Sequence, residues 1–146
     1  MAISRARRPI MLVAFALLLA FSLVASLAAS SASAADPSVR DLVIRSITIN
    51  SQTKVTTVRG AVTCRRADDL EVFVDVSQTV GRLHTVRASG DKEVDCDGRV
   101  SFTIRLRNLE GRLGPGDARV DADAFTCNRT GCFGTDLTRS MRITNG

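Results

Sequence analysis

A single histidine, His84, is the first residue of this sequence that could serve acid–base catalysis. A serine nucleophile needs a base and an orienting carboxylate, so any such triad in this chain must use His84. The G-x-S-x-G pattern of a nucleophile elbow is absent from the sequence. A lone histidine in a run with strand character is usually a surface or packing residue. We therefore predict no catalytic residue, and a hydrolase that uses His84 is the weaker alternative.

Two pairs of aspartates stand two residues apart, Asp121 with Asp123 and Asp95 with Asp97. On a strand such residues share one face about 7 Å apart, and retaining glycosidases hold two carboxyls within about 5.5 Å. Outward acids that face outward arginines are also the ordinary pattern of a solvated sheet. The arginines available for this are Arg105, Arg107 and Arg119. We interpret the aspartate pairs as parts of a solvated face.

Asp91, Asp95 and Asp97, followed by Gly98, could offer oxygen ligands to a calcium ion held between loops. The spacing of an EF-hand loop is missing, so this pattern is weak. We predict no metal site and no cofactor.

Four cysteines, Cys64, Cys96, Cys127 and Cys132, could bind zinc or form disulfides. Zinc fingers usually bring two close pairs of ligands, and only Cys127 and Cys132 are close in sequence. Three disulfide pairings are possible in principle. Cys64 and Cys96 share the inward parity of their strands, and Cys127 and Cys132 flank a tight turn, so we predict those two bonds. By chain entropy they would stabilise the fold by about 3.7 and about 2.2 kcal/mol.

The elements that must position these residues are strands, because apolar and polar residues alternate with period two after residue 36. The two most regular runs cover residues 70–77 and 99–107. Their apolar positions are Leu70, Val72, Val74 and Val76 in the first, and Val100, Phe102, Ile104 and Leu106 in the second. Weaker runs lie near residues 47–49, 58–64, 84–88, 94–96, 118–124 and 137–143.

Turn residues interrupt the alternation at residues 67–69, 81, 89–91, 97–98 and 114–116. Asp97-Gly98 between two strand-like runs indicates a two-residue hairpin turn. About seven or eight short strands at near-regular spacing are typical of a two-sheet sandwich, and a short barrel is the main rival. We predict an all-β sandwich with two disulfides over residues 42–146.

The first 34 residues are typical of a secretory signal peptide. Arg5, Arg7 and Arg8 supply positive charge, an apolar stretch runs from Ile10 to Leu27, and Ala32-Ser33-Ala34 fits the A-x-A cleavage pattern. An uncleaved anchor is the alternative, because such a stretch is just long enough to cross a bilayer. We predict a signal peptide over residues 1–34, a flexible lead-in over 35–41, and a secreted protein with no stable membrane anchor after cleavage.

Removal of that leader lowers the basic balance of the chain. Three of the 20 Lys and Arg residues lie in it, so the formal net charge falls from +5 to +2. All basic residues except Lys54 and Lys92 are Arg, a surplus that could serve anion recognition or reflect codon usage. The arginines are interleaved with acids, and Trp and Tyr are absent. We therefore predict no nucleic-acid binding, since base stacking needs aromatic faces.

Several segments resemble secreted, immunoglobulin-like bacterial domains of unknown function. They are the run Gly60-Ala61-Val62-Thr63-Cys64, then Gln78 with Gly81-Arg82, then Val94-Asp95-Cys96, and the alternating segment from Ala118 to Ala124. The resemblance covers most of the chain after the leader and implies a sandwich fold without a known activity. The C-x4-C form of Cys127 and Cys132 is also similar to neocarzinostatin-type chromophore carriers, but the first cysteine pair is spaced differently.

Together these features predict a secreted, monomeric, non-enzymatic module that binds an extracellular macromolecule or has a structural role at the cell exterior. The first alternative is a small-ligand carrier, which requires a deep pocket lined by Phe73, Phe125 or Phe133. The second is the hydrolase, which requires His84 to pack against a serine and an aspartate.

Overall fold

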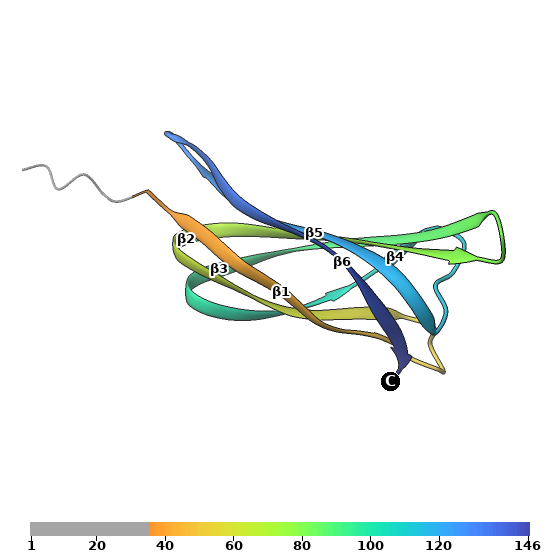
Figure 1. The fold of residues 1–146 in the computed structure, drawn as a ribbon. Coiled ribbons are helices and arrows are strands. Elements are labelled where there is room, and N and C mark those ends of the chain that lie inside the picture. The colour runs from red at the N-terminus through yellow and green to blue at the C-terminus, as the bar shows by residue number, and fades with distance from the viewer. Residues whose placement is uncertain (1–35) are drawn as a thin grey trace, which may run out of the picture. The chain divides into compact units, whose positions relative to one another are not determined.

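The structure is a computed structural model that describes residues 36–146, and the signal peptide predicted for residues 1–34 lies outside them. The described residues form an all-β unit, as predicted, with six strands and no helix (Figure 1). The strands are β1 Ser38–Ile49, β2 Thr56–Val80, β3 His84–Arg105, β4 Arg107–Glu110, β5 Gly116–Asn128 and β6 Gly131–Asn145. β1 begins at Ser38, so part of the expected lead-in, residues 38–41, belongs to a strand.

A long hairpin of β2 and β3 organises the fold. The two strands pair from Thr57 opposite Arg105 to Val80 opposite His84, with register shifts between Cys64 and Leu70. Extra residues there take positive φ, 53° at Arg66 and 57° at Asp69. Such bulges bend a ladder without ending it. The hairpin therefore contributes its first half to one layer of the fold and its second half to the other.

Each half of the hairpin recruits different neighbours. β1 pairs with residues 56–65 of β2, whereas β5 pairs with residues 71–77 and carries β6 along its other edge. The ends of β1 and β6 then meet in a short parallel contact, Ile47 to Ile49 beside Ile143 to Asn145. The strand order β1-β6-β5-β2-β3-β4, with β1 also paired to β2, makes one closed, barrel-like sheet.

The predicted two-sheet sandwich of seven or eight short strands is therefore wrong in its connectivity. Three expected turns, at residues 67–69, 89–91 and 97–98, lie inside continuous strands. Asp97-Gly98 makes no hairpin: Gly98, with φ of 100°, stays paired with Cys64 across the bend. Polar and glycine residues mark a bulge as readily as a turn, and the sequence pattern does not separate the two.

One apolar core lies between the layers. Most alternating positions predicted to face inward are buried, among them Leu70, Val72, Val74 and Val76 on β2 and Phe102 and Ile104 on β3, whereas Val94, Val100, Leu137 and Met141 are partly buried. Residues of β1, β5 and β6 join the same cluster. Gly60 is needed beside the Phe102 ring, since a Cβ there would lie 2.4 Å from the ring edge. This close packing fixes which side chains of both layers face outward.

Two disulfides join the four cysteines, and no cysteine of residues 36–146 is free. Cys64 bonds to Cys96 across β2 and β3 at the bend, where their Cα atoms are 5.9 Å apart and both side chains are buried. Cys127 bonds to Cys132 at the tip of the β5–β6 hairpin, with Cα atoms 4.0 Å apart. The first bond thus crosslinks the bend itself, and the second closes an exposed turn.

Loss of the bend crosslink should cost more stability than loss of the tip crosslink. The chain-entropy estimate gives about 3.7 kcal/mol for the Cys64→Ala/Cys96→Ala pair and about 2.2 kcal/mol for Cys127→Ala/Cys132→Ala, because the first loop is longer. Urea unfolding of the two double variants measures this order directly. Equal losses, or a larger loss at the tip, would contradict the role given to the bend.

Candidate functional site

The outer face of the layer formed by β3, β2, β5 and β6 carries the candidate site. Register places Asp91 of β3 and Asp123 of β5 on either side of Phe73 of β2. Phe125 of β5, diagonal to Phe73, stacks on it with ring centroids 5.7 Å apart and planes 6° apart. Phe73 nevertheless remains 41% exposed. A stacked aromatic pair open to solvent is unusual on the polar side of a sheet.

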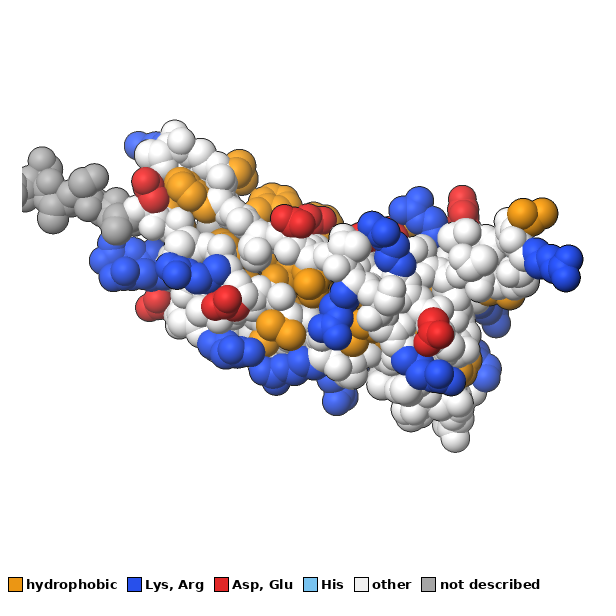
Figure 2. All heavy atoms as spheres, in the orientation of Figure 1, with side chains coloured by type: hydrophobic (Ala, Val, Ile, Leu, Met, Phe, Trp, Pro, Cys, Tyr) orange, Lys and Arg blue, Asp and Glu red, His pale blue; other side chains and the backbone are white. Residues whose placement is uncertain are grey.

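Carboxylates surround the two rings. We call this surface the acidic–aromatic face and define it as Phe73 and Phe125 with Glu71, Asp75, Asp91, Glu93, Asp121, Asp123 and Asp136. Figure 2 shows hydrophobic side chains beside acidic ones along the part of the surface over β5 and β6. The face therefore combines an apolar platform with negative charge.

Three of these acids are neutralised by arginines on the same layer. Asp75 lies 3.2 Å from Arg87, Asp91 lies 3.7 Å from Arg107, and Asp121 lies 3.0 Å from Arg119. All three pairs are largely exposed, so each contributes little to stability. They reduce the charge of the face without removing it.

The remaining four acids form two like-charged pairs. Glu71 stands directly opposite Glu93, and Asp123 directly opposite Asp136. Within residues 36–146 none of the four has an ion pair or a side-chain hydrogen bond. Directly opposed like charges destabilise a sheet. The face thus keeps two unfavourable pairs on either side of its aromatic stack.

Asp121 accepts more side-chain hydrogen bonds than any other acid of the face. Arg119 donates from Nε and Nη2 to its carboxylate, and the Thr138 hydroxyl donates a further hydrogen bond. These hydrogen bonds, Arg119 first, hold the pKa of Asp121 below its ordinary value, with the positive charges of Arg119 and Arg87 acting in the same direction. Asp121 is therefore ionised at neutral pH and unsuited to act as a general acid.

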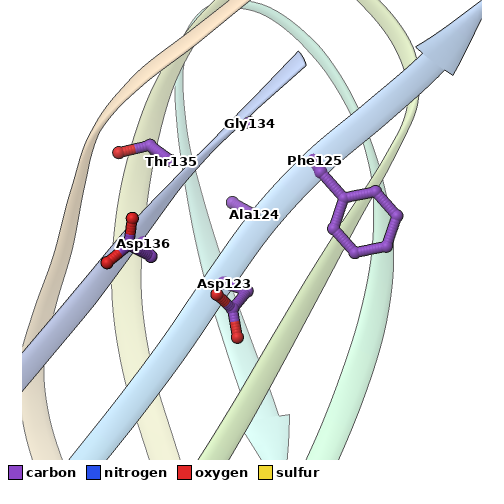
Figure 3. Close-up of a pocket in the computed structure, with 6 residues that line it drawn as sticks. All are labelled: Asp123, Ala124, Phe125, Gly134, Thr135 and Asp136. Carbon is purple, nitrogen blue, oxygen red and sulfur yellow. The ribbon is translucent and has the colours of Figure 1, made fainter. Parts of the chain in front are cut away.

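Shallow hollows flank the stacked rings. One of about 370 Å³ lies between Phe73 and the acids Asp75, Asp91, Asp121 and Asp123. A second, of about 230 Å³, is lined by Asp123, Phe125, Gly134 and Asp136, and Figure 3 shows the two carboxylates on adjacent strands, with Phe125 on the same strand as Asp123. A Cβ on Gly134 would lie 2.8 Å from the Cβ of Phe125, so glycine gives this ring its room. The face can seat cationic or amphiphilic groups.

The residues considered for catalysis do not assemble. His84 is exposed at the start of β3, next to the turn after β2, and the described residues give it no hydrogen bond or ion pair. Asp121 and Asp123 do share the outer face of β5, as predicted for a solvated sheet, but Arg119 holds the first while the second lies beside Phe73. Asp95 and Asp97 are exposed on either side of Cys96.

The calcium pattern does not converge either. Asp91 is turned toward Arg107 on the outer face. No group of three or more His, Cys, Asp or Glu side chains in the part of the chain that the structure describes could hold a metal ion. Nor does that part contain a helix long and apolar enough to cross a membrane.

The alternation over residues 70–77 implies an outward Phe73, and the aspartate pair of β5 was predicted on a solvated face, but the sequence pattern does not indicate the site that these residues form. Asp136 belongs to the face because β6 pairs with β5, and Glu93 belongs to it because β3 pairs with β2. The sequence does contain one sign of the site, because Phe73 occupies a position of the 70–77 run where the alternation calls for a polar residue. Phe133, also considered as a pocket residue, pairs with Thr126 on the inward side of β6.

Comparison with known proteins finds no family and one weak structural likeness. A scan against models of protein families finds no match, and a search of curated proteins finds none. Among solved structures, the chain is similar to AggA, the major subunit of aggregative adherence fimbriae type I from Escherichia coli. That likeness has a TM-score of 0.38 and 16% sequence identity, covering 76% of this chain and 96% of AggA. At these values it carries no inference about function.

Asp121 should make stability depend on pH. Its folded-state pKa lies below the unfolded value of about 3.9, so its interactions stabilise the fold above that value and lose their effect as the pH falls through the folded-state pKa. We expect Asp121→Asn to lower the unfolding free energy by about 0.5 kcal/mol at neutral pH and by less at pH 2. Urea unfolding at both pH values measures the difference.

Asp117→Asn is the matched control, because Asp117 lies 4.0 Å from Arg142 and both side chains are highly exposed. It should change stability little at either pH. A cost of Asp121→Asn that is the same at neutral and acid pH would contradict the assignment.

Proposed function

We propose that this chain is an exported, non-enzymatic binding module that holds a cationic segment of another macromolecule on its acidic–aromatic face. One observation carries the proposal: two like-charged pairs, Glu71 with Glu93 and Asp123 with Asp136, flank an exposed stack of two phenylalanines. A surface selected only for solubility would interleave charges of both signs and keep aromatic rings covered. The arrangement instead suits a partner that supplies the missing positive charge.

Arginine is the cation that this face suits best. A guanidinium can donate two parallel hydrogen bonds to a carboxylate, and it can also lie flat over an aromatic ring. Phe73 has carboxylates on both sides, at Asp91 and Asp123, so one side chain could contact a ring and an acid together. A partner that brings arginine or lysine would also relieve the like-charge repulsion.

A macromolecular partner suits the face better than a small ligand. The carrier alternative needs a deep cleft, whereas Phe73 and Phe125 lie on the outer surface beside shallow hollows. The charged groups spread over four strands, β3, β2, β5 and β6, which an extended segment can span. The signal-peptide pattern and two disulfides support a role outside the cytoplasm.

A single substitution should separate binding from stability. Asp136→Asn removes one repulsive pair, so we expect the unfolding free energy to rise by about 0.5 kcal/mol. The same change should weaken binding of a fluorescein-labelled hexa-arginine peptide several-fold, because a carboxylate of the face is lost. Fluorescence anisotropy at low ionic strength measures the binding, and a urea titration measures the stability.

Two further variants sharpen this test. Phe73→Ser/Phe125→Ser should also weaken peptide binding several-fold, since the cation loses its aromatic platform. Asp97→Asn removes the same charge from an exposed position outside the face and should leave the affinity nearly unchanged. Equal affinity of the wild type and the face variants, or an equal loss in Asp97→Asn, would refute the proposal.

A further inference from the structure

The other layer of the fold carries the opposite charge. Its outward positions come from β1, the first half of β2 and the second half of β3, and exposed arginines outnumber the two exposed acids there, Asp41 and Asp97. We call this surface the arginine face and define it as Arg40, Arg59, Arg65, Arg99 and Arg105. The outward residues between them are mainly hydroxyl side chains, Ser38, Ser46, Thr48, Thr57, Thr63, Ser101 and Thr103.

All five arginines of this face are exposed. In the described part of the chain none of them has a carboxylate partner, whereas Arg87, Arg107 and Arg119 of the other layer all have one. Figure 2 shows basic side chains over the region of β1, β2 and β3, with a few acidic side chains among them. The sequence interleaves arginines and acids, but the fold places these five arginines and the four unpaired acids of the acidic–aromatic face on different sides.

This sorting makes the domain strongly bipolar while its net charge stays small. The formal charge of the chain without the predicted leader is only +2, yet one face has five arginines and the other has four acids that form no ion pair with any residue of 36–146. Both faces are outer surfaces of strands that pack on one shared core. They therefore point away from each other, and two faces of one molecule cannot neutralise one another.

The two faces also match in spacing. Arg40 and Arg99 stand on either side of Thr63, on the strands that flank β2. Asp91, which has an exposed ion pair with Arg107, and Asp123, which has none among the described residues, stand in the same way on either side of Phe73, farther along β2. Each pair of charges is separated by two strand spacings, about 10 Å, because the geometry of the sheet sets both. A face of one copy can thus present its cations at the separation of the other copy's acids.

We propose that the cationic partner of the acidic–aromatic face is the arginine face of a second copy of this chain. The inference rests on the proposed function and names its partner. Such a contact is heterologous: each copy uses one face on each neighbour and keeps one face free. Association is therefore head to tail and continues beyond the dimer, in place of the monomer expected from the sequence.

Face contact explains this surface better than strand addition at an edge. The ladder of β1 with β2 has register shifts between Arg40 and Val43 and between Ile44 and Ser46, and Asp41 has a φ of 53°, so β1 is irregular where its other edge is free. Bulges of this kind obstruct the pairing of another strand. The pairing of β2 with β3 over residues 57–64 and the pairing of β2 with β5, by contrast, have no register shift.

The test uses the full chain, expressed with its own leader, and two variants that each lose one face. Arg59→Ser/Arg99→Ser removes cations from the arginine face, and Phe73→Ser/Asp123→Asn weakens the acidic–aromatic face. Sedimentation velocity of the wild type at low salt should show species that grow with concentration and return to monomer at high salt. Each variant alone should need at least tenfold higher protein concentration to associate.

An equimolar mixture of the two variants supplies the decisive control. Each variant keeps the face that the other lacks, so the mixture should form a 1:1 heterodimer and no larger species. This result also shows that both variants fold. A wild type that stays monomeric at low salt, or variants that fail to bind each other, would overturn the inference.

The hexa-arginine peptide keeps this failure distinct from failure of the proposed function. Peptide binding by a wild type that does not self-associate would refute the second copy as partner and leave the binding module standing. If the wild type neither binds the peptide nor self-associates, the proposed function and the inference about the second copy are both refuted. Binding of polyphosphate to the arginine face by copies that never associate would overturn the inference and assign that face to a polyanion.

Discussion

The bend of the β2–β3 hairpin is the constraint on which the rest of this structure depends. Register shifts between Cys64 and Leu70 let one continuous ladder turn through two layers, and the Cys64–Cys96 disulfide crosslinks the ladder at that point. β1 can then add to the first half of β2 and β5 to the second half. Closure through the short contact of β1 with β6 follows, and with it a shared core that hides one side of each layer.

The charge pattern is a consequence of that same bend. A straight hairpin would present all outward residues of β2 on one surface, with Arg59 and Arg65 in line with Glu71 and Asp75. Because the strand bends between these pairs, the arginines belong to one layer and the acids to the other. Strand parity, core packing and the bend together turn a mixed sequence of near-neutral charge into two faces of opposite sign. The binding function we propose uses one face, and self-association uses both.

Much of this fold could be predicted from the sequence, and the missing parts have physical causes. Period-two alternation identified the strands and the inward sets, so the burial of Val72 and Phe102 and the outward position of Phe73 were predictable. Alternation carries no information on which strands are neighbours. The stack of Phe73 on Phe125 and the opposition of Asp123 to Asp136 were therefore not predictable. The sequence pattern predicted turns at residues 67–69 and 97–98, where the structure has irregular strand pairing, because bulges and turns use the same residue types. The separation of arginines from acids depends on the bend and could not be seen in a linear pattern.

The central claim, that the two faces of one chain bind each other, is tested most directly by mapping the contact with NMR. Isotope-labelled Arg59→Ser/Arg99→Ser, which keeps the acidic–aromatic face, is titrated with the unlabelled variant Phe73→Ser/Asp123→Asn. The account predicts amide shift changes confined to the outer rows of residues 71–77 and 119–125 and their neighbours on β3 and β6, lost at high salt. Changes centred on β1 or on the free edge of β6, or no changes at low salt, would contradict it.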